Sequence, residues 1–441
     1  MKPRTYSSVP IERTVAGGFL SLIGAGTFLI WLFNVPVRPI GFIDALFTAT
    51  SAVCVTGLSV VDTGTFLTLP SQLVVLLLIQ LGGLGVMTAT TALPLLMGQK
   101  IDLRRRLLFV GGLGLDTPAG AVRLLFQILK LTFLFEGLGT LWLFIGFLSD
   151  ETPMRAFYLA LFHSVSAFCN AGFSLFSSNL EGYATTFAVP SAVMILVVVG
   201  GLGSPVLIEL VHRLRRGGRL SPYCRLVLLM TTVLIGLGTF LFSLTEGQEA
   251  FRALSWPLKL WNALFHSVTP RTAGFDTVSL SRFSDPGVAL TVLLMLIGAS
   301  PASTGGGMKT TTVGLLLAST WTDLRGKGEV VLWGRRIPHW TLTRATSLFF
   351  LYLGTLFLSS FLLALMEPHS FLTLFFEAVS ALGTVGLSLG VTADLGPGAK
   401  LVLVLLMFWG RVGLMTFLYG LLLEGHGGGK VSYADTDVPV G

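Results

Sequence analysis

Charged residues are scarce in this chain of 441 residues. Lys, Arg, Asp and Glu together make up 12% of the sequence, whereas hydrophobic residues make up 53% and the mean hydropathy is +0.81. Soluble domains carry roughly 25% charged residues. The composition therefore excludes an ordinary soluble domain and indicates an integral membrane protein.

Cysteine and histidine are also rare, with three and six copies. No CxxC or Cys/His spacing typical of a metal site occurs, and no Ser/His/Asp arrangement suggests a hydrolase. Cys54 and Cys169 each precede a repeated glycine by three residues, so we expect packing residues rather than a disulfide. We predict that the chain is not an enzyme. A membrane-bound enzyme or receptor stays the outside alternative, and it would need catalytic groups that converge elsewhere.

Long apolar runs dominate what is present. Each run meets the roughly 20 residues needed to cross a bilayer. The first is too long for the core of a signal peptide and has no small-residue cleavage site, so we expect it to remain. The eight runs are 14–33, 72–97, 124–148, 187–211, 226–244, 288–321 (interrupted), 343–365 and 400–423.

Four short stretches share one sequence pattern: a run of small and hydroxyl-bearing residues that ends in a glycine. The glycines are Gly57, Gly172, Gly274 and Gly386, which lie 115, 102 and 112 residues apart. Each follows an amphipathic segment too short to span a membrane. These segments are 42–52, 156–168, 258–268 and 371–382.

This spacing predicts an all-α membrane fold built from four repeated units. Each unit would hold an outer spanning helix, a re-entrant pore helix with its loop, and an inner spanning helix, giving eight transmembrane helices around a pseudo-fourfold pore. The predicted units are 1–99, 100–213, 214–324 with a broken inner helix, and 325–441 with a cytoplasmic tail.

The glycine loops predict a cation filter. Non-helical backbone at membrane depth is tolerated where it lines a watery cavity or is buried in protein, and rings of backbone carbonyls replace the hydration shell of a cation. Glycine suits such a loop because it adopts positive φ without steric cost. The predicted filter residues are Val55, Thr56, Gly57, Asn170, Ala171, Gly172, Thr272, Ala273, Gly274, Thr384, Val385 and Gly386.

The third inner run is interrupted by a polar, glycine-rich stretch at 298–312. Pro301 and three successive glycines cannot sustain a helix, so we predict a gating loop beneath the filter. Lys309 would place a positive charge there. A phosphate-binding turn is disfavoured because the Walker spacing is absent. The predicted gate residues are Ser303, Thr304, Gly305, Gly306, Gly307, Lys309 and Thr310.

Several ionisable residues lie in apolar surroundings. Arg411, about halfway along the last run, is predicted to face the pore and contact the gating loop; a salt bridge with Glu136 is the alternative. Glu377, Asp62 and Asp276 either concentrate cations at the mouth or are solvated rim residues. The matching His163 and His266 are expected to anchor the re-entrant helices rather than to relay protons.

Basic residues gather in the segments between the units, whereas acidic residues gather in the opposite loops. The positive-inside rule then places both termini in the cytoplasm and the glycine loops outside. The net charge of +7 reflects this topology and gives no indication of nucleic-acid binding, although a basic cytoplasmic face could contact anionic membrane lipid.

The motifs together resemble the Trk/Ktr/HKT superfamily of potassium transporters, and within it the Ktr membrane subunit. The specific signatures are Thr-Gly-Leu-Ser-Val-Val-Asp-Thr (56–63), Asn-Ala-Gly-Phe (170–173), Arg-Thr-Ala-Gly-Phe (271–275), Ser-Thr-Gly-Gly-Gly-Met-Lys-Thr-Thr-Thr (303–312) and Gly-Arg-Val-Gly (410–413). The resemblance implies gated K⁺ uptake across the cytoplasmic (cell inner) membrane, with K⁺ at the four filter glycines and the 303–312 loop and Arg411 as an internal barrier.

The resemblance also implies a homodimer that works with a cytoplasmic, nucleotide-binding (KtrA-like) ring, which this chain does not encode. No nucleotide is expected on this chain. One glycine per loop favours K⁺ over Na⁺, but less strictly than the longer signature of stringent K⁺ channels. A K⁺ symporter coupled to Na⁺ or H⁺ would use the same scaffold and stays the alternative, with Na⁺ as activator or coupling ion.

Overall fold

The computed structural model describes residues 11–85, 121–326 and 328–413, and within these ranges four helices are long and apolar enough to cross a membrane. They are α1 (Ile11–Asn34), α6 (Ala121–Phe147), α10 (Pro222–Thr245) and α14 (His339–Met366). Large apolar side chains such as Phe133, Leu237 and Phe361 are more than half exposed on them. A helix that keeps such side chains outside is suited to a lipid environment.

Four shorter helices follow the long ones, and they match the short amphipathic segments predicted from the sequence. They are α2 (Phe42–Val53), α7 (Pro153–Phe168), α11 (Trp256–Val268) and α15 (Phe371–Gly383). The longest has 16 residues, or about 24 Å at 1.5 Å per residue, which is shorter than the ~30 Å hydrocarbon core. Their C-terminal halves are buried, so each points into the protein.

A third set runs back from the short helices: α3 (Leu69–Leu84), α8 (Ala188–Leu202), α12 (Asp285–Leu296) and α16 (Pro397–Val412). Three of them end at a glycine with positive φ: Gly85 at 82°, Gly203 at 89° and Gly413 at 93°. A helix cannot continue through that conformation. The predicted runs 72–97 and 400–423 extend beyond residues 85 and 413, outside the described residues.

The prediction of one continuous span over 187–211 is wrong. The chain bends by 99° at Gly203, between α8 and the basic helix α9 (Ser204–Arg216). Positive φ at Gly203 ends the first helix, and Pro205 in the first turn suits the start of the next. The inner run of the second unit is therefore broken as well as that of the third, and the boundary drawn at residue 213 falls inside α9.

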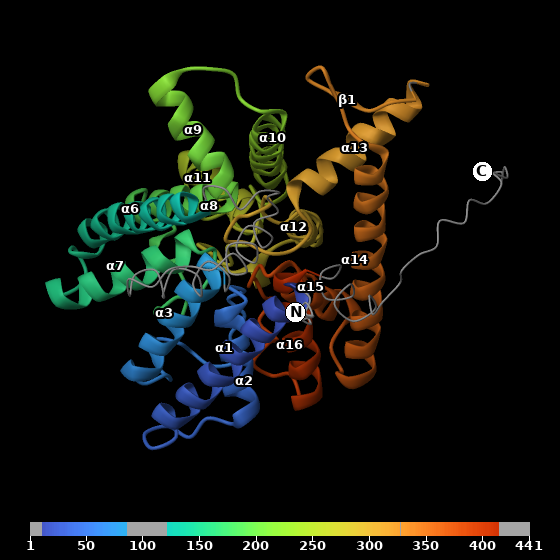
Figure 1. Cartoon of the computed structure of the whole chain (residues 1–441). Helices are drawn as coiled ribbons and strands as arrows, with labels where there is room; N and C mark the ends of the chain where they lie inside the picture. Colours follow the sequence, from blue (N-terminus) through green and yellow to red (C-terminus); the bar gives the residue numbers. More distant parts are fainter. Residues whose placement is uncertain (1–10, 86–120, 327, 414–441) are drawn as a thin grey trace, which may run out of the picture.

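The helices form a closed cycle of four groups. Each long helix packs on the short helix that follows it, and each third-set helix contacts the short helix of the next group: α3 with α7, α8 with α11, α12 with α15, and α16 with α2. Figure 1 shows the groups in colour order around the centre of the molecule, from blue through green and yellow to red. The first and last groups therefore lie side by side.

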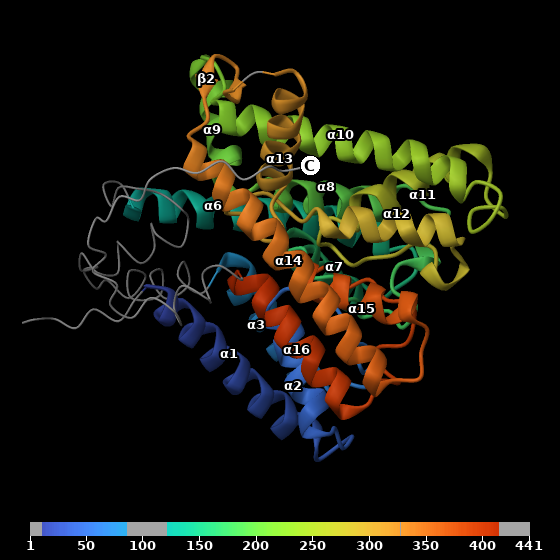
Figure 2. The same cartoon turned by 90° about the vertical axis from the view of Figure 1, so that its right-hand side faces the viewer.

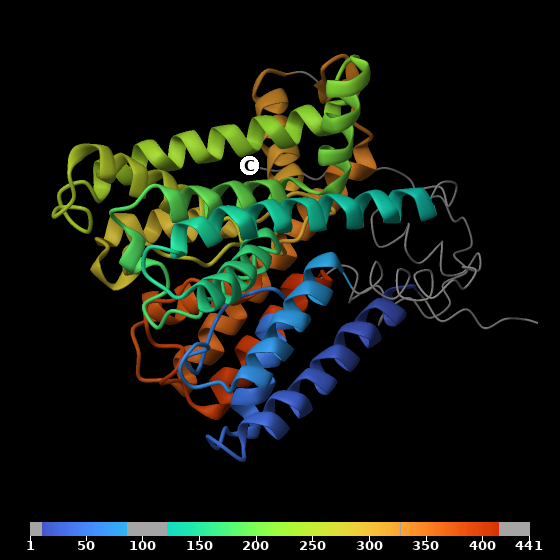
Figure 3. The same ribbon diagram turned by 90° about the vertical axis from the view of Figure 1, so that its left-hand side faces the viewer.

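The third group has an additional excursion. An irregular stretch follows α12 and leads into α13 (Thr310–Leu324), so Thr310, predicted as part of the loop, is the first residue of a helix. A small hairpin, β1 (Val331–Leu332) and β2 (Arg335–Arg336), then precedes α14. Figures 2 and 3 show α9, α13 and the hairpin at the same end of the molecule, beside one end of α10.

Candidate functional site

The four glycine loops share an alternating backbone. In each, the glycine and the residue two positions before it have positive φ, and the residue between them does not. Alternation of left-handed and ordinary residues lets successive carbonyl groups face the same side of a loop, as a carbonyl-lined filter requires. The pairs are Val55 (57°) with Gly57 (97°), Asn170 (60°) with Gly172 (68°), Thr272 (73°) with Gly274 (76°), and Thr384 (49°) with Gly386 (92°).

These loops meet in a ring. A methyl group added to Gly57 would contact the carbonyl oxygen of Ala171, one added to Gly172 that of Ala273, one added to Gly274 that of Val385, and one added to Gly386 that of Thr56. The carbonyl in each case belongs to the residue just before the next glycine. The structure therefore brings together all twelve of the predicted filter residues, with too little room for any side chain at the four glycines.

Hydroxyl groups at the ends of the short helices hold the loops. Ser51 Oγ accepts from the Gly57 amide at 3.0 Å, and Ser380 Oγ accepts from the Gly386 amide at 3.1 Å. In the second group Ser166 Oγ donates to the Phe173 carbonyl at 2.8 Å. This role was not predicted from the hydroxyl-rich stretches, although Ser51 and Ser380 each lie six residues before their glycine and this matched spacing indicates it.

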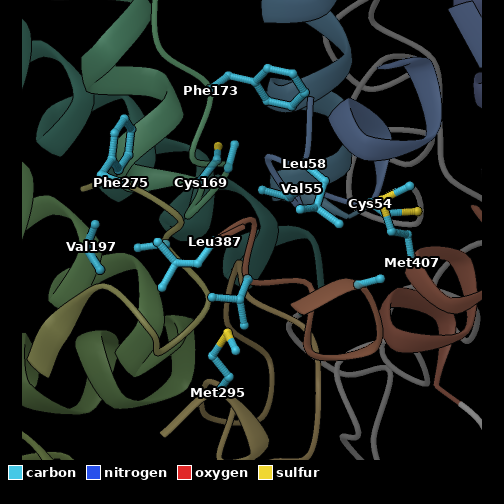
Figure 4. Packing of buried hydrophobic residues seen from close by; sticks show 14 of the residues in the cluster. Cys54, Val55, Leu58, Cys169, Phe173, Val197, Phe275, Met295, Leu387 and Met407 are labelled. Carbon is cyan, nitrogen blue, oxygen red and sulfur yellow. The ribbon is translucent and has the colours of Figure 1, made fainter. Parts of the chain in front are cut away.

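A large apolar residue follows each glycine and packs behind the loop. Leu58, Phe173, Phe275 and Leu387 are at most 2% exposed, and Figure 4 shows them in the apolar cluster that surrounds the four loops. Because this cluster is close-packed, it fixes the loop backbone from outside the ring.

The stretch between α12 and α13 lies against the ring. The Gly306 amide donates to Thr384 Oγ1 at 3.0 Å, and a methyl group added to Gly305 would contact Thr272 Oγ1. Thr304 Oγ1 donates to the Phe168 carbonyl at 3.2 Å, at the end of α7. The predicted gating residues therefore contact the third and fourth loops and the end of α7, at the base of the ring.

Arg411 joins this stretch to the first group. Its guanidinium donates to the Thr304 carbonyl and to the Gly82 carbonyl near the end of α3. Lys309 Nζ donates to the Gly305 carbonyl at 2.8 Å, so its charge folds back onto its own loop. The structure thus places two cationic groups directly under the ring.

The alternative of an Arg411–Glu136 salt bridge is wrong. Glu136 is 5% exposed, accepts from Gln80 Nε2 at 3.3 Å, and lies 3.9 Å from Cys169 Sγ. It lines a mostly apolar groove of about 760 Å³ between α3, α6 and α7. The guanidinium of Arg411 instead donates to backbone carbonyls, so its hydrogen bonds are satisfied without a buried carboxylate.

A cavity of about 340 Å³ opens on the other side of the ring. It is lined by the four loop glycines and by three carboxylates: Asp62, Asp276 and Glu181. The structure thus places Asp62 and Asp276 at the mouth, as one of the two sequence hypotheses held, and adds Glu181, an acidic residue of the outer loops that was not assigned to the mouth from the sequence. Three acidic side chains beside a carbonyl ring favour cations.

Glu377 does not belong to this mouth. It is fully buried in α15, where its carboxylate accepts from Ser388 Oγ at 2.5 Å and from Thr392 Oγ1 at 2.8 Å. Both hydroxyls lie in the segment after Gly386. Glu377 therefore holds its own loop and cannot concentrate cations, so both sequence hypotheses for this residue are wrong.

The two matching histidines differ. His163 Nδ1 contacts the Leu159 carbonyl at 2.8 Å and its Nε2 contacts Ser174 Oγ at 3.0 Å, which is the anchoring predicted for both. His266 Nε2 is buried without a hydrogen-bond partner in the part of the chain that the structure describes. The prediction for His266 is wrong in this respect. Within the same residues, no cluster of His, Cys, Asp and Glu could hold a metal ion.

Comparison with known proteins agrees with this architecture. The chain is similar to the Ktr system potassium uptake protein B of Bacillus subtilis, with 36% identity over 97% of this chain and 96% of that protein. It is 35% identical to the protein of the same name in Vibrio alginolyticus, over 93% and 90% of the two chains. A potassium/sodium uptake protein, NtpJ of Enterococcus hirae, is 35% identical over 97% and 96%.

The fold has a solved counterpart. The crystal structure of the potassium transporter TrkH from Vibrio parahaemolyticus aligns with a TM-score of 0.74 at 21% identity, and the match covers 96% of this chain and 86% of that one. The TrkH family, described as cation transport protein, matches residues 11–421. The chain therefore belongs to the TrkH family of cation transport proteins.

Proposed function

We propose that this chain is the pore-forming membrane subunit of a potassium uptake system. The observation that carries the proposal is the closed ring of four alternating glycine loops with an acidic cavity on one side and a cationic loop on the other. Dehydrated K⁺ would bind carbonyls of the ring. The relatives named as potassium uptake proteins support K⁺ as the transported ion.

The stretch from Ser303 to Lys309, together with Arg411, is the internal gate of this proposal. In the structure it touches the base of the ring, and its cationic groups oppose a permeating cation. Opening would break two contacts of this stretch. The Gly306 amide would separate from Thr384, and the Thr304 carbonyl would separate from Arg411. Each bond is individually weak, so a partner subunit that binds the open form more tightly can shift the equilibrium.

The surrounding assembly belongs to the same proposal. Eight spanning helices in four repeated units would place the basic end of α9 and the C-cap Arg325 of α13 in the cytoplasm, with both chain termini on that side of the cytoplasmic membrane. We further propose a homodimer with one pore per protomer, regulated by a separate cytoplasmic nucleotide-binding ring. The description of the relatives as parts of a Ktr system supports a multi-subunit arrangement.

Uptake of ⁸⁶Rb⁺ or K⁺ into proteoliposomes that contain the purified chain tests this function. Selective K⁺ uptake, competed weakly by Na⁺, is the expected result. A matched measurement with a regulatory ring added separates an obligatory partner from a wrong assignment. Absence of K⁺ flux in both preparations, with folded protein present, contradicts the proposal.

A Na⁺-coupled symporter is the second candidate, because one relative is named as a potassium/sodium uptake protein. Coupling predicts that K⁺ uptake follows an imposed Na⁺ gradient. A gated pore predicts that Na⁺ changes the rate without driving K⁺ against its own gradient.

A further inference from the structure

The groove between α3, α6 and α7 contains two polar side chains that ion permeation does not use. Its volume is about 760 Å³, within the range of about 300–1,000 Å³ that is typical of small-molecule sites. Helix α7 packs against both α6 and α3, and Figure 1 shows the three helices on one side of the molecule. None of the loop glycines lines the groove, so it is separate from the ring.

The walls of the groove are apolar and partly exposed. Four of the large side chains that line it are at least half exposed: Leu77, Phe133, Leu141 and Phe157. Helix α6 is also one of the helices long and apolar enough to cross a membrane. The groove is therefore suited to a lipophilic molecule that enters from the hydrocarbon of a bilayer rather than to a solute from water.

Glu136 and Gln80 present hydrogen-bond acceptors that the protein leaves partly unused. Glu136 is 5% exposed, and its Oε2 accepts from Gln80 Nε2 at 3.3 Å. Gln80 Oε1 is buried and has no hydrogen-bond partner in the part of the chain that the structure describes. Thr140, the third polar residue of the lining, uses its hydroxyl to donate to the Glu136 carbonyl at 2.7 Å. The side chains of the groove thus offer free acceptors, while their donors are already used.

A carboxyl group at this position calls for a partner. Ionisable side chains within a membrane are costly and usually pair, and an unsatisfied buried acceptor costs about 1–3 kcal/mol. The thiol of Cys169, 3.9 Å from Glu136 Oε1, is only a weak donor. Among the described residues, no Lys, Arg or His lines the groove. The group that would complete this site is therefore a hydrogen-bond donor that carries positive charge.

We propose that the groove binds a lipophilic primary amine, whose alkyl chain lies along the apolar walls and whose ammonium group lies between Glu136 and Gln80. The ammonium donates to the Glu136 carboxylate and to Gln80 Oε1, so one group supplies both the charge and the donors. If the carboxyl carries a proton beforehand, that proton passes to the amine nitrogen and the same ion pair forms. An acyl chain alone leaves both acceptors unpaired, and Glu136 repels an alkyl carboxylate.

Dodecylamine is the probe for this site, added to the purified full chain in detergent. A ligand that binds the folded protein raises its thermal midpoint with a saturable dependence on concentration. We expect this for dodecylamine, a weaker effect for dodecanol, which donates without a charge, and no effect for dodecanoate. Equal shifts for the three compounds, or no shift with dodecylamine, overturn the proposal. The measurement involves no ion flux, so its outcome is independent of the proposed K⁺ uptake.

Two variants locate the bound amine. Glu136→Gln keeps the size of the side chain and an acceptor but removes the charge, so it should weaken dodecylamine binding at least tenfold. Gly137→Leu should fill the groove and abolish binding. It should also fold, because a Cβ at Gly137 meets nothing within 4 Å, so it tests the proposal even if Glu136→Gln does not fold.

Two further variants are the controls. Gly354→Leu places the same side chain at a glycine that is equally free of neighbours and lies outside the groove. Asp394→Asn removes an exposed carboxylate that does not line it. Both should keep the wild-type affinity for dodecylamine. Wild-type affinity in Glu136→Gln and Gly137→Leu as well would show that the amine acts through the detergent micelle, and would overturn the proposal.

Discussion

Lys400 Nζ lies 2.8 Å from Asp44 Oδ1, and this ion pair joins the first turn of α16 to the first turn of α2. The two residues are 356 positions apart in the chain. Their side chains are 13% and 30% exposed, so water screens the pair only partly. It connects the last group of helices to the first, at the seam where the cycle closes.

Lys400→Met should lower the thermal midpoint of the protein in detergent by a few degrees, corresponding to about 1 kcal/mol. The expected loss is small because neither side chain is fully buried, and because Asp44 retains access to water. Arg336→Gln is the matched control, since the Arg336–Glu329 pair is 65% and 54% exposed and should contribute almost nothing. Equal effects of both variants would contradict a role at the seam.

Gly57→Ser should lower the K⁺/Na⁺ uptake ratio about tenfold, equivalent to ~1.4 kcal/mol of lost discrimination. A Cβ there meets the Ala171 carbonyl, and φ of 97° strains any side-chain-bearing residue, so the ring must deform. Gly354→Ala has nothing within 4 Å of the added methyl group and should leave the ratio unchanged. Parallel ion-flux measurements decide, and an unaltered ratio in Gly57→Ser argues against the filter.

Deletion of Gly305–Gly307 should raise maximal K⁺ uptake several-fold. These residues contact Thr272, Thr384 and Gly410 at the base of the ring, and the deletion removes those contacts. Uptake is measured at saturating K⁺ with surface expression matched to the wild type. Unchanged or slower uptake would assign the loop a structural role only.

Thr384→Val is a milder test of the same gate. It leaves the buried Gly306 amide unpaired, which costs about 1–3 kcal/mol in the closed form, so open probability should rise. Valine already stands at the equivalent position in the first loop, Val55. Thr56→Val is the control, because the Thr56 hydroxyl is buried without a partner and valine stands at its equivalent, Val385. Equal open probabilities of both variants, in single-channel or flux recordings, would contradict a role of the Gly306–Thr384 hydrogen bond in closing the gate.

The stability of the loop that follows Gly57 should depend on pH through Asp62. Its Oδ1 accepts from the Gly64 and Thr65 amides, each at 2.8 Å. Burial raises its pKa, but hydrogen bonds from Ser177, Thr65 and Gly64 outweigh that effect and hold the pKa below its usual 3.8. The stabilisation is therefore present above about pH 4 and is lost as pH falls through the lowered pKa. Asp62→Asn should be less stable than the wild type at neutral pH and equally stable in acid.

Repetition in the sequence allowed the short helices and the meeting of the four glycine loops to be predicted, because four glycines in register constrain one another. The conformation of Val55 and Thr384 could not be predicted. β-Branched residues rarely adopt positive φ, and here the packing of the ring imposes it. The ion pair between Asp44 and Lys400 could not be predicted either, because the two residues are 356 positions apart.

Two features that were not predicted could have been predicted from the sequence. Gly203 followed by Ser204 and Pro205 is a typical helix end and helix start, so the bend after α8 could have been predicted. The register that matches His163 with His266 also includes Glu377, and its alignment would have indicated a residue that holds its loop. By contrast, the partners of Arg411 are backbone carbonyls of two distant segments, which only the folded chain brings together.

The contact between α16 and α2 has a consequence for biosynthesis. The chain is made from its N-terminus, so three inserted groups leave an arc of carbonyls with one side open to neighbouring helices and lipid. The ring exists only after Gly386 meets Thr56, when the last group docks on the first. A chain that stops before the last group therefore lacks the contact that closes the ring.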